Sequence, residues 1–329
     1  MNRVKIGMMS FAHMHAYSYA ACLKQLDDVE FVGIADDDSK RAAEAARKFG
    51  VKSFSSYEEL LDTDVQGIIV CSENVHHRRH VVVAAQHGKH VLCEKPLSTT
   101  HEDADAMIEV CRRANVKLQT AFPCRFHPAF INLKKAVKAG NIGKLLAISA
   151  TNQGKCPFDW LVDTKLSGGG AVIDHTVHVL DLIRCLTGAE PIKVYAEIDN
   201  RMFNKDFDDT GVLTIDFSDG MFVTIDASWS RPKSYPTWGN VKMQVTGTEG
   251  VAEMDMFAQT TDVFCDKTMS YSQEYWGDYT DLGLVASFAK SIADDTPVPI
   301  TGEDGAKALT VALAAYQSAK TGKPVELAS

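Results

Sequence analysis

The stretch Ile6–Ala16, IGMMSFAHMHA, decides the fold together with its two flanks. The apolar run Val4–Met9, VKIGMM, predicts a buried strand, and the run Ala16–Leu26, AYSYAACLKQL, predicts a helix. A tight turn between a first strand and a first helix is where dinucleotide-binding domains carry their phosphate loop. The stretch therefore raises the question of whether this chain has such a domain, and whether the loop still binds its ligand.

The first third of the chain continues this alternation of strand and helix patterns. Further strands are predicted over Val29–Asp36, Val65–Ser72, Lys89–Lys95 and Val116–Phe122. Further helices are predicted over Ser39–Gly50, Glu58–Leu61, His76–Gly88 and His101–Asn115. Strands separated by helices of this length predict a parallel sheet with helices on both faces.

The pattern changes after Phe122. Successive strand patterns with turns between them are predicted over Ile192–Asp199, Thr210–Phe217, Met221–Trp229, Val241–Gly247, Val251–Phe257 and Thr260–Cys265. The turn Ser218–Gly220 joins two of them directly, which predicts antiparallel pairing. We therefore predict an α/β protein with a Rossmann domain over 1–122 and an α+β domain with a largely antiparallel open sheet over 123–329.

Composition narrows the possible partners of the 329 residues. Lys plus Arg number 34 and Asp plus Glu number 43, which gives a formal net charge of −9. An acidic chain without a basic cluster is a poor ligand for nucleic acid or anionic membranes. The eight cysteines include no C-x-x-C pair, and the sequence has no apolar run of membrane-spanning length. We expect no signal peptide, because the apolar residues at the start form a strand pattern. We expect reduced thiols and a cytoplasmic location.

The phosphate loop itself departs from the G-x-G-x-x-G fingerprint. Its three glycine positions fall on Ser10, Ala12 and His15. Serine and alanine are small, so the tight turn and the close approach of a ligand can survive at the first two positions. The histidine at the third position is a real departure, which changes helix packing or shifts the loop.

An acidic residue favours a cofactor despite this loop. Asp36 ends the second predicted strand, 21 residues after His15 (36 − 15), where the fingerprint places an acid that binds the adenosine ribose. The neighbouring Asp37 and Asp38 add charge that would repel a 2′-phosphate, so NAD is favoured over NADP. The alternative is a solvated acidic turn that caps the next helix, an interpretation that suits Asp37 or Asp38 better than Asp36.

Two further features lie where catalysis is expected. Glu94-Lys95-Pro96 ends a parallel strand, and a lysine there can polarise a substrate oxygen, although a lone lysine is usually a surface charge. In Gly168–Leu182, GGGAVIDHTVHVLDL, the glycines let the backbone approach a ligand closely. Asp174 and His178 follow at a spacing of i, i+4, which suits a general acid/base and its orienting carboxylate, or a helix-capping acid and a packed histidine.

A histidine cluster also needs interpretation. His13 and His15 form an H-x-H pair, with His76, His77 and His175 as conceivable partners. The spacing does not place both rings on one helix face and fixes none of the partners. We therefore expect no metal site.

These motifs together resemble the Gfo/Idh/MocA family of nicotinamide-dependent oxidoreductases. The matching segments run in order over nearly the whole chain: QHGKHVLCEKPL at Gln86–Leu97, CRFHPA at Cys124–Ala129, NIGKL at Asn141–Leu145, the glycine block Gly168–Gly188, and AYQSAKTGKPVEL at Ala315–Leu327. The resemblance implies a Rossmann domain that holds the cofactor and a C-terminal domain that covers the substrate and often forms an oligomer interface.

The resemblance also implies roles for individual residues. Lys95 matches the catalytic lysine, His178 the catalytic histidine and Asp174 its partnering acid. The expected cofactor-binding residues are Ser10, Phe11, Ala12, His13, Asp36, Ser72, Asn74, His77, Glu94 and Lys95. Glu73 departs from the family pattern, which has proline at this position.

The resemblance implies hydride transfer between NAD and a CH–OH or C=O group of a sugar, polyol or cyclitol. Two alternatives stay open: a glycoside hydrolase that uses its nicotinamide transiently, and a non-enzymatic sensor of sugar or NAD. We expect a small-molecule substrate, NAD rather than NADP, and a homodimer or homotetramer.

Overall fold

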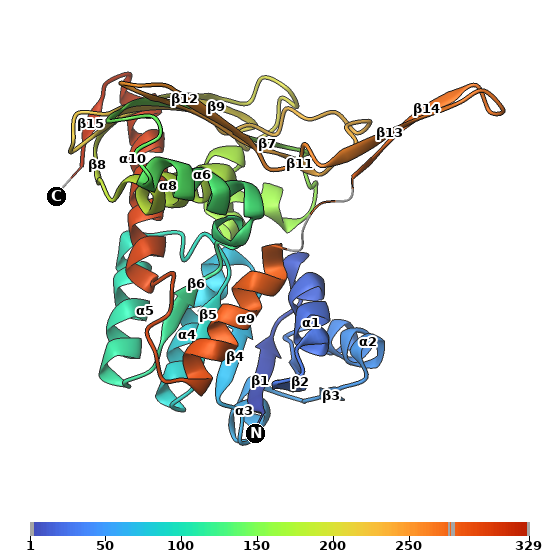
Figure 1. The fold of residues 1–329 in the computed structure, drawn as a ribbon. Helices are drawn as coiled ribbons and strands as arrows, with labels where there is room; N and C mark the ends of the chain where they lie inside the picture. Colours follow the sequence, from blue (N-terminus) through green and yellow to red (C-terminus); the bar gives the residue numbers. More distant parts are fainter. Residues whose placement is uncertain (1–2, 276, 278–279, 328–329) are drawn as a thin grey trace. The chain divides into compact units, whose positions relative to one another are not determined.

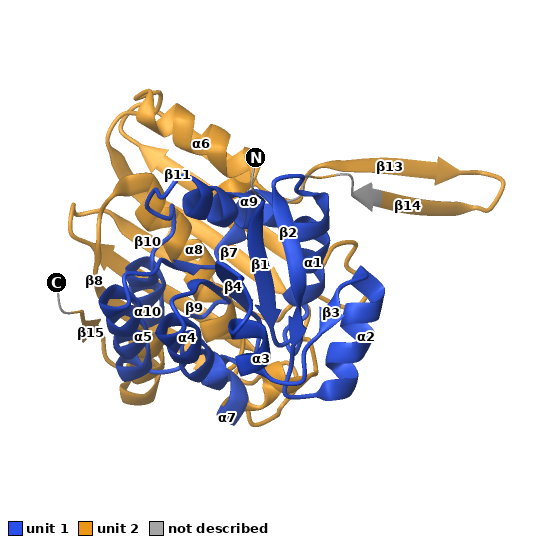
Figure 2. Ribbon diagram, turned by 90° about the horizontal axis from the view of Figure 1, so that it is seen from below, with its two compact units in different colours: residues 1–123, 165–168, 280–309 blue, residues 124–164, 169–279, 310–329 orange. Residues whose placement is uncertain are grey.

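The computed structural model describes residues 3–275, 277 and 280–327. The chain separates into two compact units, which Figure 2 colours differently. Unit 1 comprises Met1–Pro123, Lys165–Gly168 and Thr280–Leu309. Unit 2 comprises Cys124–Thr164, Gly169–Tyr279 and Thr310–Ser329.

Unit 1 is built on a six-stranded sheet in the order β3-β2-β1-β4-β5-β6, and every pair in it is parallel. The strands are β1 (Val4–Met9), β2 (Val29–Ala35), β3 (Lys52–Ser53), β4 (Gly67–Val70), β5 (His90–Cys93) and β6 (Leu118–Thr120). Every residue of β4 is buried, which requires cover on both faces of the sheet. The predicted parallel sheet is confirmed. Strand order reverses between β1 and β4, and the carboxyl ends of these strands are where such sheets bind ligands.

Most helices of unit 1 connect these strands, while α9 comes from a later segment of the chain (Figure 1). They are α1 (His15–Gln25), α2 (Ser39–Phe49), α3 (Tyr57–Leu61), α4 (His77–Gln86), α5 (His101–Arg113), α9 (Thr280–Ala293) and the short η1 (Asn74–His76). Side chains of Asp38, Ser56 and Thr100 cap the N-termini of α2, α3 and α5. Helix α1 differs from these three, because its N-cap residue Met14 provides no side-chain cap.

Unit 2 contains a seven-stranded sheet in the order β12-β11-β7-β10-β9-β8-β15. The strands are β7 (Leu145–Gly154), β8 (Pro191–Asp199), β9 (Thr210–Phe217), β10 (Phe222–Asp226), β11 (Gly239–Gly247), β12 (Val251–Asp255) and β15 (Val325–Glu326). The predicted antiparallel pairing of β9 with β10 across Ser218–Gly220 is confirmed. The pair β7–β10 is parallel and the other pairs are antiparallel, so the sheet is largely antiparallel, as predicted.

Helices of unit 2 pack on this sheet, α8 (Ala171–Thr187) against β7 and β9, and α6 (Pro128–Lys138) against β12. The unit also contains η3 (Trp160–Val162). Three elements have residues in both units: η2 (Pro123–Phe126), α7 (Thr164–Ser167) and α10 (Gly302–Thr321). No helix among the described residues combines the length and the apolar character needed to cross a membrane.

A hairpin stands apart from the main sheet of unit 2. Strand β13 (Thr260–Cys265) pairs with β14 (Ser270–Tyr275), and Figure 1 shows the two strands extending away from the other strands of the unit. The strand predicted over 260–265 is present, although its partner β14 was not among the predicted strands.

The compact units do not follow two continuous stretches of chain. Helix α9 belongs to unit 1 because it packs against α1 and β1. The predicted division into domains over 1–122 and 123–329 remains our proposal for the domain boundary.

Candidate cofactor and active site

The β1–α1 loop makes its tight turn without glycine. Ser10 takes up the left-handed φ of 67° that the first glycine of the fingerprint would adopt freely. The side chain of Ser10 supports the turn, since its Oγ accepts a hydrogen bond from the amide of Ala12 at 3.2 Å. The tight turn expected at Ser10 is therefore present in the structure.

The amides of this loop donate to acceptors within the protein. The Phe11 amide donates to Asp36 Oδ2 at 2.6 Å, and the His13 amide donates to the Cys71 carbonyl at 2.9 Å. The His15 amide donates to Nδ1 of His13 at 3.2 Å. These bonds brace the loop against β2 and the end of β4, and they occupy donors that a phosphate would otherwise receive.

Asp36 lies at the end of β2, as predicted, and its carboxylate is fully engaged. Besides the Phe11 amide, it accepts from the Asp38 amide at 2.9 Å and from Arg41 Nε and Nη2 at 2.8 and 2.6 Å. A carboxylate offers about four acceptor positions, so ribose hydroxyls must compete with these donors. Asp38 caps α2, which fits the alternative interpretation given above for the acidic turn.

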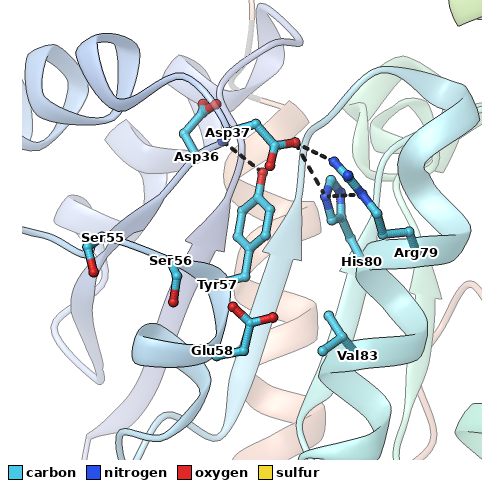
Figure 3. Close-up of a pocket in the computed structure, with 9 residues that line it drawn as sticks. All are labelled: Asp36, Asp37, Ser55, Ser56, Tyr57, Glu58, Arg79, His80 and Val83. Atoms are coloured by element: carbon cyan, nitrogen blue, oxygen red, sulfur yellow. Dashed lines mark hydrogen bonds and ion pairs between the residues drawn. The ribbon is translucent and has the colours of Figure 1, made fainter.

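A cavity of about 410 Å³ opens beside Asp36 (Figure 3). Its lining residues are Asp36, Asp37, Ser55, Ser56, Tyr57, Glu58, Arg79, His80 and Val83. Within it, Arg79 pairs with Asp37, whose amide donates to the Tyr57 hydroxyl at 3.1 Å. Sequence reasoning missed Tyr57 and Arg79, because only the fold brings them to the end of β2, and it missed Arg41 although that residue lies only five positions after Asp36.

His80 in this cavity wall is neutral near pH 7. Burial, followed by the positive charge of Arg79, lowers the pKa of His80 to about 3. Its Nε2 accepts from Arg79 Nε at 3.2 Å, and so its Nδ1 carries the proton and donates to Ser72 Oγ at 2.9 Å. Ser72, a predicted cofactor residue, is thereby held in place by α4.

The other residues predicted around the end of β4 are buried as well. The Asn74 side-chain amide donates to the Ser167 carbonyl at 2.8 Å, while its Oδ1 is buried without a hydrogen-bond partner among the described residues. His77 is fully buried between the Ser72 carbonyl at 3.2 Å and the Pro96 carbonyl at 3.0 Å. Asn74 thus retains an acceptor for a ligand, whereas His77 braces two strand-end segments against each other.

Glu94 and Lys95 follow β5 and are almost completely buried. Glu94 Oε1 lies 3.0 Å from His15 Nδ1, and Oε2 accepts from the Lys95 amide at 2.9 Å. Burial alone would raise the pKa of Glu94, but the charge of the neighbouring histidines outweighs it and holds this pKa far below its usual value. Glu94 is therefore a buried carboxylate anion that orients His15.

The three glycines before α8 pack against protein groups on the side where a β-carbon would lie, and close approach of a ligand to this backbone stays a prediction. A β-carbon on Gly168 would lie 2.6 Å from Thr99, and one on Gly169 would lie 2.3 Å from the Tyr316 hydroxyl. A β-carbon on Gly170 would lie 2.1 Å from the Asp208 carbonyl oxygen. The Asp208 carboxylate accepts from the Gly170 and Val172 amides at 2.7 and 2.8 Å and so caps the helix.

Asp174 and His178 lie on α8 and are 5% and 7% exposed. Asp174 Oδ2 accepts a hydrogen bond from Trp229 Nε1 at 3.3 Å and lies 3.2 Å from His175 Nε2. Trp229 is 1% exposed and part of the core of unit 2. The sequence did not reveal Trp229 as a partner of Asp174, because the indole comes from a segment 55 residues away. His175 is the next residue in the chain, but we did not predict its contact with Asp174.

The predicted site residues divide between the units. The predicted cofactor-binding residues and Lys95 belong to unit 1, whereas Asp174 and His178 belong to unit 2.

Both halves of the chain match models of known protein families. Residues 4–122 match a model described as an oxidoreductase family with an NAD-binding Rossmann fold, and residues 130–253 match the GFO/IDH/MocA C-terminal domain. The chain belongs to the Gfo/Idh/MocA family. The resemblance stated from the sequence motifs is thus confirmed, and with it an NAD-binding Rossmann fold in an oxidoreductase.

Individual relatives match over nearly the whole chain. The myo-inositol 2-dehydrogenase of Thermotoga maritima is 32% identical, over 98% of this chain and 97% of that protein. The scyllo-inositol 2-dehydrogenase (NAD(+)) of Bacillus subtilis is 25% identical, over 99% and 97%.

Solved structures show the same fold. A probable dehydrogenase from Thermotoga maritima superposes with a TM-score of 0.85 at 30% identity, covering 98% of both chains. GenD2 from gentamicin A biosynthesis, solved in complex with NAD, gives a TM-score of 0.92 at 22% identity, covering 100% of this chain and 97% of that one.

Proposed function

We propose that this protein transfers a hydride between NAD and a CH–OH or C=O group of a sugar, polyol or cyclitol, with Lys95, His178 and Asp174 as its catalytic set. The observation that carries the proposal is Lys95, buried after β5 next to the carboxylate of Glu94. A lysine buried beside a carboxylate at the carboxyl end of a parallel strand lies where this kind of sheet carries out its chemistry.

The residues of unit 1 fit the cofactor. The cavity beside Asp36 lies at the carboxyl end of β2, where an adenosine is expected in this fold. The buried Oδ1 of Asn74 is an acceptor still available to an amide or hydroxyl donor of a ligand. Asp36 and Tyr57 would hold the adenosine end, and Ser72, Asn74, Glu94 and Lys95 the nicotinamide end. NAD, when bound, supplies the hydride acceptor.

The chain's own groups supply the proton chemistry. His178 takes the proton of the substrate hydroxyl, and the Lys95 ammonium stabilises the negative charge that develops on that oxygen. Asp174, which accepts from the Trp229 indole and lies 3.2 Å from His175 Nε2, is the group that orients His178 in this proposal. In the reverse direction, His178 returns the proton to the carbonyl oxygen.

The relatives support the substrate class. Two of them are named as inositol dehydrogenases, and another is the 1,5-anhydro-D-fructose reductase of Ensifer adhaerens. Cyclic polyols and sugars share vicinal hydroxyl groups on a ring. These relatives therefore support a ring CH–OH group as the group oxidised here.

A substrate panel tests the proposal. Purified protein is incubated with NAD⁺ and, in turn, myo-inositol, scyllo-inositol and common aldoses, while NADH is followed by absorbance. We expect NADH to accumulate in stoichiometric amounts with at least one of these compounds. An aryl glycoside is incubated in the same way. Its cleavage without any release of NADH would instead support the hydrolase alternative and contradict net oxidation.

We further propose that the protein acts in the cytoplasm, as a homodimer or homotetramer, without nucleic-acid or membrane partners. All eight cysteines are free, which suits a reducing compartment. Val212, Phe222 and Val251 on strands of the seven-stranded sheet are each more than half exposed, which suits a face covered by another copy. Sedimentation equilibrium of the purified protein gives the oligomeric state directly, and a monomer at all concentrations would contradict it.

A further inference from the structure

The β1–α1 loop is poorly equipped to bind a diphosphate through its backbone. In a glycine-rich loop, amides at the helix N-terminus face the phosphates. Here the amides of Phe11, Ala12, His13 and His15 donate to protein acceptors. With these four amides engaged, a side chain at this loop is the better source of charge for a diphosphate.

The side chains that gather there are those of His13, His15 and Glu94. Their nitrogen and carboxylate oxygen atoms lie within 4.8 Å of one another, and the two imidazole centroids are 4.3 Å apart. Glu94 is fully buried and His13 is 2% exposed, whereas the side chain of His15 is 31% exposed. Within this cluster His15 is the group that reaches the surface where a ligand would arrive.

Hydrogen bonding fixes which protons these rings carry. Glu94 Oε1 accepts from His15 Nδ1 at 3.0 Å, so protonation of His15 adds a second donor at Nε2. His13 Nδ1 accepts from the His15 amide, so the proton of the neutral His13 ring is on Nε2. A metal ion would have to displace these protons, and with His15 protonated the cluster is a set of N–H donors around one buried carboxylate.

We propose that His15, oriented by Glu94, is the cationic group that binds the diphosphate of the nicotinamide cofactor in this chain, in place of the amides of a glycine-rich loop. This inference rests on the proposed NAD-dependent function and assigns a role to the histidine at the third glycine position. Phosphate oxygens accept hydrogen bonds from a charged donor about twice as strongly as from a neutral one.

The electrostatic surroundings of His15 favour its charged form. Burial lowers the pKa of His15, but the charge of Glu94 and the hydrogen bond to it outweigh burial, and the net result is a raised pKa. Lys95 opposes the charge of His15 and Asp281 supports it, while the His13 ring lies 4.3 Å away and would oppose it if protonated. The cofactor affinity should therefore be highest below the pKa of His15 and fall as the pH rises through it.

Calorimetric titration with ADP-ribose tests this inference, because ADP-ribose carries the diphosphate without the nicotinamide. Between about pH 6 and pH 9 we expect the wild-type affinity to fall about tenfold or more. His15→Gln should bind about tenfold more weakly at low pH and show no pH dependence. His15→Lys, which keeps a positive charge, should retain affinity over the whole range. Adenosine, without phosphates, should bind all variants alike, and His101→Gln on the exposed start of α5 is the matched control.

The outcomes separate this inference from the proposed function. If His15→Gln and His15→Lys both bind ADP-ribose as the wild type does at every pH, the role of His15 is refuted while NAD binding stands. If chelation abolishes ADP-ribose binding and zinc restores it, a metal ion binds the diphosphate and the inference is also refuted. If the wild type binds neither NADH nor ADP-ribose, the proposed function fails together with it.

Discussion

Helices α1 and α8 begin in sequences that differ in their glycines. Three glycines, Gly168–Gly170, precede α8, whereas none lies between β1 and α1. At α8 the glycines admit protein groups, since Asp208 caps the helix and the Tyr316 hydroxyl lies against Gly169. At α1 the loop reaches its turn through Ser10 in a left-handed conformation.

Glycine in a loop before a helix therefore indicates close packing of the backbone and does not by itself indicate a ligand-binding site. At α8 the space beside the glycines is taken by Asp208, whose partly buried carboxylate also accepts from the Tyr316 hydroxyl at 2.9 Å. At α1 the groups that meet the loop are side chains: Asp36 on the Phe11 amide and Glu94 on His15. The capped start of α8 positions Asp174 and His178. At the start of α1, the side chain of His15 is the group that we propose for binding the cofactor.

The largest expected effect comes from the groups placed after β5 and on α8. Lys95→Met and His178→Gln should each lower kcat by about 10³-fold, because each removes a charge or a proton acceptor needed in the transition state. NADH affinity of His178→Gln, measured by calorimetry, should stay within about threefold of wild type. Lys40→Met on α2 is the exposed control. Near-wild-type turnover of both variants would refute the catalytic assignment.

The role of glycine at α8 is tested next by Gly170→Ala. Because the new β-carbon would meet the Asp208 carbonyl at 2.1 Å, the substitution should lower the free energy of unfolding by about 2–4 kcal/mol. Urea denaturation measures this loss. Gly250→Ala in the same unit, where the nearest atom would be 3.5 Å away, should change stability by less than about 1 kcal/mol. Equal losses in the two variants would contradict the packing role of Gly170.

A smaller effect is expected at the ribose end. Arg41→Gln releases two of the donors that occupy Asp36 and removes a cation that could meet a 2′-phosphate. Binding of NADPH should weaken about tenfold, whereas NADH should bind equally well or a few-fold more tightly. Arg47→Gln, exposed on the same helix, is the control. A loss of NADH affinity as large as that of NADPH would show that Arg41 supports the loop and does not set cofactor preference.

The smallest effect is expected from Ser10→Gly. Glycine adopts the φ of 67° without strain, but the substitution loses the hydrogen bond from the Ala12 amide to Ser10 Oγ. The two terms oppose each other, so the free energy of unfolding should change by less than about 1 kcal/mol. Urea denaturation gives the value, and a loss beyond about 2 kcal/mol would mean that serine at this position does more than complete the turn.

Local patterns predicted much of this molecule. Apolar runs located β1, β2, β4 and β5, and the acids at their ends, Asp36 and Glu94, lie where the pattern placed them. The parallel pairing of β7 with β10 could not be predicted, because it joins distant segments of the chain. The hairpin joins neighbouring segments, but β14 reads SYSQEY and lacks the apolar run by which the other strands were located.

The site residues show the same limit. The i, i+4 spacing placed Asp174 and His178 on one helix, but the Trp229 contact to Asp174 spans 55 residues. The pairing of Arg41 with Asp36 is short in sequence, and a search for a basic residue one turn into α2 would have found it. The glycines Gly168–Gly170 leave room for Asp208 and Tyr316, and these two residues are too far away in sequence for a local pattern to connect them with the glycines.

The most direct test of the central claim is a calorimetric titration of the cofactor-stripped protein with NAD⁺, NADH, NADP⁺ and NADPH. We expect NAD⁺ and NADH to bind one site per chain, more tightly than their phosphorylated counterparts, and we expect Asp36→Ala to weaken their binding. Absence of binding by all four would mean that the glycine-free loop has closed the site, and it would contradict the proposed oxidoreductase function.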